Sequence, residues 1–270
     1  MITNWIGRMY NILQVAVTSS LEDSLISRQA MNYAEILGIP FITRKKMSLN
    51  KIREMYELDY LLVVEKEKVI LKGETTLFWH PSMAVPRLKA LRNGNIDPMI
   101  EAMDLKVNYN ILDCTLGMAA DALVSAFAVG IKGKVTGLEA NKYIAFITKW
   151  GMDNFAGQNT HIKELFPRIN AINIRYENFL EKQADNSFDV VYFDPMFRRG
   201  FHRSNSINAM RPFAEHQALN IEIIEEALRV AKYRVVLKES SSSSEFERLG
   251  CKEIMGGKYS HLAYGVWKKY

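Results

Sequence analysis

Three acidic residues stand directly after short apolar runs in the second half of the chain. Asp113 follows the first run and precedes a turn that contains Gly117. Glu139 ends the second run, and Asp194, which Pro195 follows, ends the third. Carboxylates accept hydrogen bonds from hydroxyl and amino groups, and the carboxyl ends of parallel strands meet at one edge of a sheet. The three residues are therefore expected to line one ligand site.

The segment around Gly117 has the form of a nucleotide-binding turn. Residues 113–121 read Asp-Cys-Thr-Leu-Gly-Met-Ala-Ala-Asp. A strand that ends in an acid, turns through Thr115 and Gly117 and enters an apolar helix places backbone N–H groups beside a ligand. Glu139, at the end of the next strand, can accept both hydroxyls of a ribose. The pattern predicts a ligand that contains a ribose.

Two cofactors compete for this turn. A dinucleotide requires Gly-x-Gly-x-x-Gly so that the backbone can approach its pyrophosphate, and only Gly117 is present here. S-adenosylmethionine carries no phosphate, so its site needs fewer glycines and favours an acid, here Asp113, near its cationic amino acid moiety. The sequence therefore favours S-adenosylmethionine. An ordinary strand-turn-helix unit without a ligand is the remaining alternative.

The segment 187–197 combines an acid, a proline and an aromatic ring. Its strand delivers Asp194 to the same sheet edge, and Pro195 fixes the turn so that the next carbonyl groups point into the cleft. A carboxylate and a carbonyl that accept both N–H bonds of an exocyclic amine would aim the nitrogen lone pair at a sulfonium methyl. Phe197, after Met196, would stack on the base that carries the amine.

The first 80 residues have the pattern of a small α/β unit. Five runs rich in β-branched and aromatic residues are expected to be strands: residues 14–18, 40–43, 60–64, 68–72 and 76–79. Helices are expected at 25–37 and from a Ser48 cap to residue 58. Two further helical segments, 85–91 and 98–103, are expected within a linker over residues 81–109.

Residues 110–270 alternate strands with helices as a mostly parallel sheet does. Five apolar runs are expected to be parallel strands: residues 111–112, 134–138, 172–176, 190–193 and 234–238. The last two strands, 253–255 and 261–267, should form an antiparallel hairpin. The predicted fold class is α/β. A Rossmann-like domain over residues 81–270, with a seven-stranded sheet that ends in an antiparallel strand, follows a small N-terminal α/β domain over residues 1–80.

These motifs resemble the class I S-adenosylmethionine-dependent methyltransferases, and in particular the RsmJ-like family of small-subunit ribosomal RNA guanine-N2 methyltransferases. The resemblance covers about residues 80–270. It rests on four segments: 113–121, Asp-Pro-Met-Phe at 194–197, Arg-Val-Val-Leu-Lys at 234–238, and Gly-Lys-Tyr-Ser-His-Leu-Ala-Tyr at 257–264. Where the family usually has Gly-Arg, this chain has Ala119-Ala120.

The resemblance also implies roles for individual residues. Cofactor contacts are implied at seven positions: Ala120, Asp121, Glu139, Ala140, Asn178, Phe179 and Asp194. The catalytic segment is implied to consist of Asp194, Pro195, Met196 and Phe197. These positions agree with those that the strand ends alone suggest.

Basic stretches without acids offer contacts for RNA phosphates. Four arginines lie between residues 198 and 213: Arg198, Arg199, Arg203 and Arg211. Because the first three follow the catalytic segment closely, we expect them to contact RNA, together with Lys238 at a strand end. The runs 44–53 and 87–92, which hold Arg87, Lys89 and Arg92, would either extend this track or lie on solvated faces.

Composition limits the remaining classes of protein. The chain has 270 residues, of which 48% are hydrophobic, and a net charge of +5, which permits a polyanionic partner. Its two cysteines, Cys114 and Cys251, lack metal-ligand spacing, so neither a disulfide framework nor a metal site is expected. No apolar run approaches the roughly 18 residues of a membrane span, which indicates a cytoplasmic protein without a membrane partner.

The sequence as a whole predicts an enzyme that moves a methyl group from S-adenosylmethionine to an exocyclic amine of RNA. Guanine N2 in small-subunit ribosomal RNA is the expected target. Two alternatives stay open: a methyltransferase for a small-molecule or protein amine, and an RNA-binding module that keeps the fold without turnover. Loss of cofactor binding would identify the second alternative.

Overall fold

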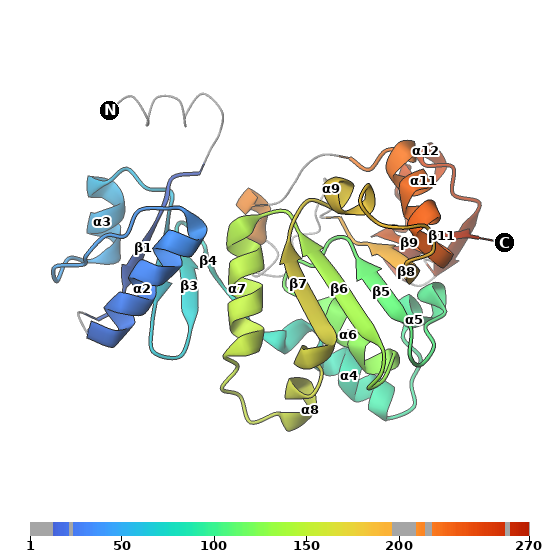
Figure 1. Cartoon of the computed structure of the whole chain (residues 1–270), viewed down its shortest axis with the longest axis horizontal. Coiled ribbons are helices and arrows are strands. Elements are labelled where there is room, and N and C mark those ends of the chain that lie inside the picture. The colour runs from blue at the N-terminus through green and yellow to red at the C-terminus, as the bar shows by residue number, and fades with distance from the viewer. Residues whose placement is uncertain (1–12, 22–23, 196–208, 214–217, 257–259, 270) are drawn as a thin grey trace. The chain divides into compact units, whose positions relative to one another are not determined.

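The chain divides into two compact units, a smaller one on the residues up to Trp79 and a larger one that begins at His80 (Figure 1). The computed structural model describes residues 13–21, 24–195, 209–213, 218–256 and 260–269. Short segments at 153–156 and 209–212 group with the smaller unit. Each unit is built on its own sheet.

The smaller unit has a four-stranded sheet in the order β1-β2-β3-β4. Its strands are β1 (Val15–Ser19), β2 (Tyr60–Val64), β3 (Val69–Lys72) and β4 (Thr76–Phe78). β1 and β2 are parallel and the other neighbours antiparallel. All residues of β1 and β2 are buried, as in strands that are covered on both faces. α2 (Ser24–Leu37) and α3 (Leu49–Met55) pack against these two strands.

The expected strand at 40–43 is wrong, because these residues form only a bridge between Phe41 and Val17. The N–H of Ile42 donates to the carbonyl of Val17, and a second bond ties Val17 to Pro40. Three residues further on, Lys45 and then Lys46 adopt left-handed conformations, with φ of 46° and 60°. They turn the chain away before a ladder can continue.

The helix that Ser48 begins is shorter than expected. The Oγ atom of Ser48 accepts the N–H of Lys51 at 3.2 Å, which is the predicted cap. The helix ends at Met55 rather than at residue 58, because Glu57 is left-handed with φ of 51°. The N–H of Leu58 then bonds back to the carbonyl of Arg53 and closes the helix end.

The larger unit has a seven-stranded sheet in the order β10-β11-β9-β8-β5-β6-β7. β5 to β9 are mutually parallel, and β11 is antiparallel to both β9 and β10. The predicted Rossmann-like sheet with an antiparallel strand at its end is thereby confirmed. The strands are β5 (Asn110–Asp113), β6 (Lys134–Glu139), β7 (Ile169–Asn173), β8 (Phe188–Phe193), β9 (Ala231–Ser240), β10 (Glu253–Gly256) and β11 (Leu262–Lys268).

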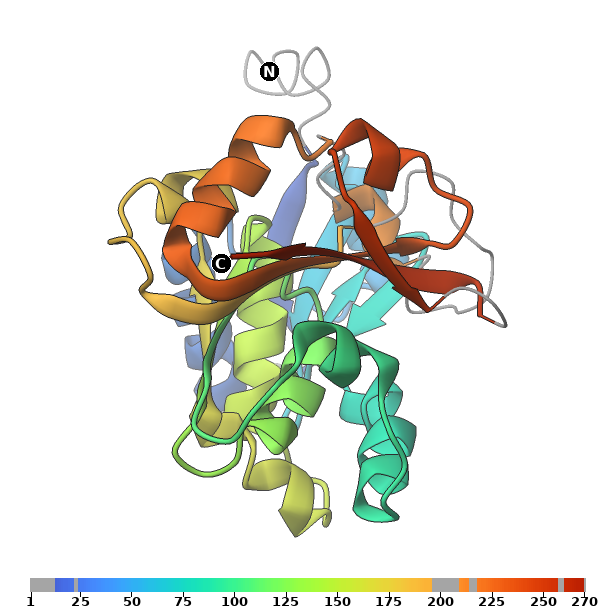
Figure 2. The ribbon, with the colours of Figure 1, turned by 90° about the vertical axis from the view of Figure 1, so that its right-hand side faces the viewer.

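Helices cover both faces of this sheet. In Figure 2, α11 and α12 lie on one side of β9 and β11, and α4 and α5 lie on the other. The α-helices are α4 (Val85–Arg92), α5 (Pro98–Met103), α6 (Ala120–Ala128), α7 (Lys142–Asp153), α8 (Thr160–Lys163), α9 (Tyr176–Leu180), α11 (Ile221–Val230) and α12 (Glu245–Arg248). The described residues also form the 3-10 turns η1 (Pro81–Met83), η2 (Phe166–Arg168) and η3 (Arg211–Phe213).

β7 lies three residues earlier than the sequence indicates. The expected strand was 172–176, but Ile169 already pairs with Val135 of β6, and Tyr176 begins α9. The alternating apolar residues Ile172 and Ile174 belong to the end of the ladder and the first residue after it. Periodicity located the strand but not its start.

A continuous apolar core holds the strands that end at the candidate site. Leu112 of β5, Val191 of β8 and Val235 of β9 pack with Ile224 and Ala227 of α11. All five side chains are at most 2% exposed. Because these three neighbouring strands are held by close packing against α11, the residues at their carboxyl ends have little freedom to move.

Within the described part of the chain, no helix has the length and apolar character that a bilayer crossing requires.

Candidate active site

Four neighbouring strands bring candidate residues to one edge of the sheet. β6, β5, β8 and β9 are adjacent and run in the same direction. Asp113 and Glu139 are the last residues of β5 and β6, and Asp194 directly follows β8. Lys238 lies near the end of β9. The edge therefore gathers three carboxyl groups and one ammonium group.

A left-handed turn after β5 is fastened to β6 and α7. Gly117 has φ of 51°, which favours glycine, and its N–H donates to Oε2 of Glu139 at 3.0 Å. The hydroxyl of Thr148, buried in α7, donates to the carbonyl of Gly117 at 2.8 Å. Leu116 bonds to the carbonyl of Leu138 at 2.8 Å. The turn is thus set by hydrogen bonds from both sides.

The strand end at Asp113 is joined to the strand end at Asp194. Oδ1 of Asp113 accepts the N–H of Thr115 at 3.0 Å. The hydroxyl of Thr115 in turn accepts the N–H of Asp194 at 2.6 Å. Thr115 therefore links the Gly117 turn to Asp194, so that a displacement of the turn would also displace Asp194.

The start of α6 leaves backbone N–H groups open. Ala119, fully buried, is left-handed with φ of 62°, a conformation that costs a residue with a Cβ about 1–2 kcal/mol. Glycine adopts this conformation without that cost. Among the described residues no side chain caps this helix, so the N–H groups of Ala120 and Asp121 are available to a negatively charged group.

Gly137 in β6 is a functional position that the sequence analysis did not identify. A Cβ on this residue would lie 2.4 Å from Cδ1 of Leu116 and 3.0 Å from its Cγ. Leu116 is buried and belongs to the turn. A glycine within a strand often marks such a close approach, and this was the available signal.

Glu139 has the geometry of a hydroxyl acceptor. Its Oε1 accepts the N–H of Asn141 at 2.8 Å and its Oε2 that of Gly117, and a carboxylate oxygen can accept more than one hydrogen bond. Asn173 holds the loop by donating to the carbonyls of Glu139 and Ala140 at 2.8 and 3.1 Å. Glu139 and Ala140 are half-buried.

The segment after β7 places one further acceptor near this edge. Asn178 in α9 is exposed, and Phe179 tilts against Phe188 with ring centroids 6.2 Å apart. Oε2 of Glu177, which the sequence analysis did not identify, is buried and has no hydrogen-bond partner among the described residues. A buried acceptor of this kind is satisfied when a ligand donates to it.

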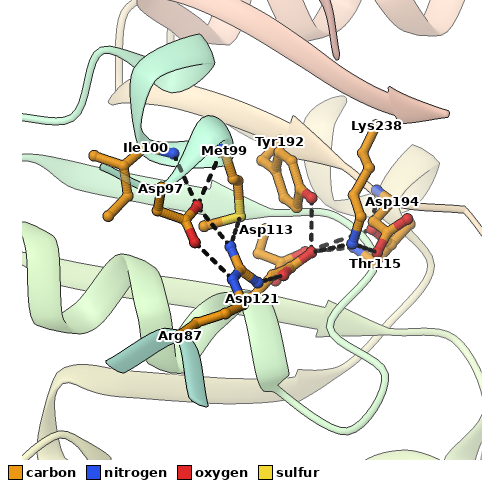
Figure 3. Close-up of polar contacts among 10 residues, drawn as sticks. All are labelled: Arg87, Asp97, Met99, Ile100, Asp113, Thr115, Asp121, Tyr192, Asp194 and Lys238. Atoms are coloured by element: carbon orange, nitrogen blue, oxygen red, sulfur yellow. Dashed lines mark hydrogen bonds and ion pairs between the residues drawn. The ribbon is translucent and has the colours of Figure 1, made fainter. Parts of the chain in front are cut away.

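Asp121 is the centre of a network of buried charges (Figure 3). Oδ1 of Asp121 pairs with the guanidinium of Arg87. Its Oδ2 accepts the hydroxyl of Tyr192 at 2.7 Å and the ammonium of Lys238 at 2.9 Å. Both oxygens are therefore in use, which leaves the Asp121 backbone N–H, rather than its carboxylate, for a cofactor contact.

Lys238 lies between two carboxylates. Its Nζ is 2.7 Å from Oδ2 of Asp194 and 2.9 Å from Oδ2 of Asp121, and its side chain is only 15% exposed. A lysine in this position already has two anionic partners, so the expected contact with an RNA phosphate would require that these ion pairs break. The geometry favours a role within the site.

Arg87 and Asp97 support the network from the segment before the sheet. The guanidinium of Arg87 forms two bonds with Asp97, at 2.7 and 2.8 Å. Oδ1 of Asp97 also caps α5 by accepting the N–H of Met99 at 3.0 Å. Arg87 is therefore a partner of two buried carboxylates and not part of an exposed basic track. Only Lys89 and Arg92 of that run are exposed.

These contacts set opposite pKa shifts on neighbouring carboxyls. Burial raises the pKa of Asp113 to about 8. For Asp194, burial raises the pKa to about 6, with Asp121 adding to the shift and Lys238 opposing it. Burial would also raise the pKa of Asp121, but Lys238 and Arg87 outweigh it and hold that pKa below its ordinary value. Asp194 is therefore mostly ionised at neutral pH and close to its protonation midpoint.

Several predicted site residues lie outside the described part of the chain. These are Met196, Phe197, Arg198, Arg199 and Arg203. Pro195, the last described residue before them, is half-buried at the sheet edge. The catalytic and RNA-contact roles of these residues remain predictions.

The residues at this edge fit S-adenosylmethionine. The Glu139 carboxylate, at the end of β6, is an acceptor group of the kind that vicinal hydroxyls bind, and the open N–H groups at the start of α6 suit a carboxylate. The unpartnered oxygen of Glu177 suits an amino donor. An excess of carboxylates at the edge is complementary to a sulfonium and an ammonium group. The turn lacks the second and third glycines that close approach to a pyrophosphate requires.

Known proteins with similar sequences are found over nearly the whole chain. Residues 45–261 match the family model described as "Putative SAM-dependent methyltransferase". The YpiP protein of Bacillus subtilis, described as uncharacterized, is 36% identical over 244 residues, which are 88% of this chain and 93% of that protein. A ribosomal RNA small subunit methyltransferase J of Colwellia psychrerythraea is 30% identical over 168 residues, 58% of each chain.

A solved structure shows the same fold. The SAM-dependent methyltransferase NGO1261 of Neisseria gonorrhoeae aligns with a TM-score of 0.63 and 18% identity over 95% of this chain and 96% of its own. The family model spans most of the chain and includes every strand from β2 to β10. The chain therefore belongs to the family of S-adenosylmethionine-dependent methyltransferases and is related to the RsmJ enzymes.

Proposed function

We propose that this enzyme methylates an exocyclic amine of an RNA base, guanine N2 in small-subunit ribosomal RNA. The observation that carries the proposal is the position of Asp194 and Pro195 beside the Gly117 turn, at the end of a strand adjacent to the one that bears Lys238. The similarity to ribosomal RNA small subunit methyltransferase J supports the substrate class.

Asp194 and Pro195 suit an amine whose lone pair is delocalised into a ring. The Asp194 carboxylate and the Pro195 carbonyl would each accept one N–H of the amine, which turns the nitrogen lone pair toward the cofactor. Bound S-adenosylmethionine supplies an electrophilic methyl group on a sulfonium. The nitrogen would become positively charged as it bonds to the methyl carbon and the bond from that carbon to the sulfonium sulfur breaks, which leaves a neutral thioether, and the nearby carboxylate would stabilise the charge on nitrogen.

Asp194 also suits the removal of the proton. With a pKa of about 6, its carboxylate is ionised before the reaction and can take the N–H proton of the methylated amine directly or through water. The side chain of Asp194 is 28% exposed, which leaves a path to solvent. No separate general base is required.

The smaller unit is proposed to hold the RNA. We place the domain boundary after residue 80, with the methyltransferase domain and its helical segment 81–109 on the C-terminal side. Lys45 and Lys51 are exposed on the smaller unit, whereas Arg44 is used internally, since it donates to the carbonyls of Ser20 and Met47 at 2.7 and 2.9 Å. Exposed lysines of this kind suit phosphates.

The test is to map modified nucleosides by mass spectrometry in ribosomal RNA from cells with and without the gene. We expect one N2-methylguanosine of the small-subunit RNA to disappear and to return with the wild-type gene but not with Asp194→Ala. Purified enzyme and S-adenosylmethionine should restore the mark on RNA or subunits from the deletion strain. Unchanged ribosomal RNA would refute the substrate, and methylation of a small-molecule or protein amine instead would favour the alternative enzyme.

A further inference from the structure

Among the described residues, the charges around Asp194 do not balance. Two cations, Arg87 and Lys238, face three carboxylates, those of Asp97, Asp121 and Asp194. A fourth carboxyl nearby, Asp113, adds no charge at neutral pH because burial raises its pKa to about 8. The cluster therefore carries one negative charge more than its own side chains neutralise.

The unbalanced charge lies where a positive charge arises during the reaction. Asp97 and Asp121 are each tied to Arg87, and both oxygens of Asp121 are occupied (Figure 3). Asp194 is the outermost carboxyl of the three, at 28% exposure against 8% and 11%. The amine nitrogen, which becomes cationic on methylation, would supply the missing positive charge at Asp194.

We propose that Lys238, anchored by Asp121 and through it by Arg87 and Asp97, is a positioning residue that keeps Asp194 ionised and fixes its orientation for the methyl-accepting amine. The role in orienting an amine rests on the proposed function. The effect of Lys238 on the charge of Asp194 does not depend on the substrate. The chain Asp97–Arg87–Asp121–Lys238–Asp194 connects helix α4 with the acceptor residue through contacts of at most 2.9 Å. It replaces the expected role of Lys238 in RNA binding.

Each link of the chain has a separate reason to be rigid. Arg87 binds Asp97 through two parallel bonds, which fixes the plane of its guanidinium. Asp97 is itself fixed as the cap of α5. Asp121 lies in the first turn of α6, where a carboxylate interacts favourably with the helix dipole. The position of Nζ of Lys238 is therefore fixed by Asp121 on one side and by Asp194 on the other.

The tyrosines next to this series of ion pairs do not carry a charge that could replace that of Lys238. Tyr192 donates its hydroxyl to Asp121, and burial holds its pKa well above the ordinary value. Tyr264 of β11 pairs with Lys238 in the sheet, and burial raises its pKa to about 12. Both tyrosines stay neutral at physiological pH. Lys238 is therefore the one cation among the described residues that contacts Asp194.

Loss of the Lys238 charge and loss of the Asp121 charge should shift the pKa of Asp194 in opposite directions. In Lys238→Gln, burial and Asp121 act without opposition, so the pKa of Asp194 should rise by about 1–3 units. In Asp121→Asn, a neighbouring negative charge disappears while Lys238 stays, so that pKa should fall. A residue that only supports the fold would give no such pair of opposite shifts.

The decisive measurement is a carboxyl-carbon NMR titration of cofactor-free protein labelled at aspartate, with the Asp194 signal identified by its loss in Asp194→Asn. We expect a wild-type midpoint near 6, a higher midpoint in Lys238→Gln and a lower one in Asp121→Asn. Lys238→Arg should restore most of the wild-type value. If Lys238→Gln does not fold, Arg87→Gln provides a second variant, in which Asp121 draws Lys238 away from Asp194 and the midpoint rises.

A matched control exists on the same strand. Lys232 lies near the start of β9 and pairs with Asp189 at 3.0 Å, so Lys232→Gln also removes a lysine–aspartate pair. Its side chain is 40% exposed and it is not near Asp194 in the sheet. This variant should leave the titration of Asp194 unchanged. A shift equal to that of Lys238→Gln would overturn the proposal.

Turnover measurements distinguish the proposed positioning role of Lys238 from a role in binding RNA. At pH 7, Lys238→Gln should lower kcat by about 2- to 100-fold through the smaller ionised fraction of Asp194, with the acid limb of the pH profile moved upward. If Lys238 instead binds a phosphate, Lys238→Gln should raise KM for RNA and leave the Asp194 titration at the wild-type midpoint. The slope of log binding constant against log salt concentration should then decrease by about one, as expected for the loss of one phosphate contact. That result would overturn the proposal. If the titration shifts as expected but RNA is not methylated, the positioning role of Lys238 is supported and the proposed substrate is refuted.

Discussion

The site has a cofactor half, formed by the Gly117 turn with Glu139, and an acceptor half, formed by Asp194 with Lys238 and Asp121. In the cofactor half, backbone N–H groups bond to one carboxylate, and the residues involved come from one β-α-β unit, β5-α6-β6, and the loop that follows it. In the acceptor half, side-chain charges from β8, β9, α6 and α4 bond to each other. The first half depends on backbone geometry and the second on charge balance.

This difference has a consequence for how each half fails. A backbone turn is disturbed mainly by changes in volume, and the effect is a weaker fit of the ligand. A buried ion-pair network responds to the loss of one charge with a shift in the protonation of the others. Variants of the cofactor half should therefore change affinity, and variants of the acceptor half should change rate and its dependence on pH.

The largest effect is expected at Asp194. Asp194→Ala removes the group that holds the amine and stabilises its positive charge, so kcat should fall by about 10²–10⁴-fold. Affinity for S-adenosylhomocysteine, measured by calorimetric titration, should stay near the wild-type value. Asp185→Ala, which removes a carboxylate that is 68% exposed, is the control and should keep full activity. Equal loss of cofactor affinity in Asp194→Ala would show that the two halves are not separable.

At Glu139 the pattern should reverse. Glu139→Ala removes the acceptor for the ribose hydroxyls and a partner of the Gly117 N–H, so the Kd for S-adenosylhomocysteine should rise about 10- to 100-fold. The control is Glu181→Ala, an exposed glutamate at the end of α9. The Asp194 midpoint in the NMR titration should not move. Undiminished binding would mean that Glu139 does not hold the ribose.

The same difference explains what could be predicted from the sequence. Asp113, Gly117 and Glu139 are recognisable because the turn and its acid come from consecutive elements with fixed spacing. Their strands also follow from apolar periodicity, as the seven-stranded sheet shows. Local patterns are sufficient for this half.

The acceptor half was only partly predictable, for a physical reason. The ion pair between Arg87 and Asp121 joins residues 34 positions apart, and that between Lys238 and Asp121 joins residues 117 positions apart. Charge pairs at such separations leave no local pattern, so Arg87 and Lys238 resemble exposed basic residues in the sequence. The burial that turns them into partners of carboxylates is a property of the folded chain.

The close approach between Gly137 and the turn offers a volume test of the cofactor half. Gly137→Ala would place a Cβ against Leu116, which should lower the free energy of unfolding by about 1–3 kcal/mol and weaken S-adenosylhomocysteine binding. Urea denaturation and calorimetry measure both effects. The double variant Gly137→Ala with Leu116→Ala should lose less than the sum of the single variants. Additive losses would show that Leu116 is not the source of the conflict.

Asp113 connects the two halves and should affect the pH dependence of stability. Its pKa is about 8 in the folded protein against an ordinary 3.8, so its contribution to stability is complete below about pH 4 and is lost as the pH rises toward 8. Asp113→Asn should remove this loss, so that the free energy of unfolding rises relative to wild type at pH 7 and above and changes little at pH 4. Urea titrations at pH 5 and pH 8 test it. A variant whose stability changes with pH as the wild type does would contradict the shift.

The smallest effect is expected at Ala119, the left-handed residue before α6. Ala119→Gly should relieve about 1–2 kcal/mol of backbone strain and lose about 0.4–1 kcal/mol to the greater freedom of the unfolded chain, a net gain of about 0.5–1 kcal/mol. The matched control is Ala128→Gly at the end of α6, a helical position where glycine should destabilise. Because the turn geometry is unchanged, cofactor affinity and the pKa of Asp194 should both stay constant. A loss of stability in Ala119→Gly would mean that the Cβ of Ala119, fully buried, contributes more through packing than it costs through strain.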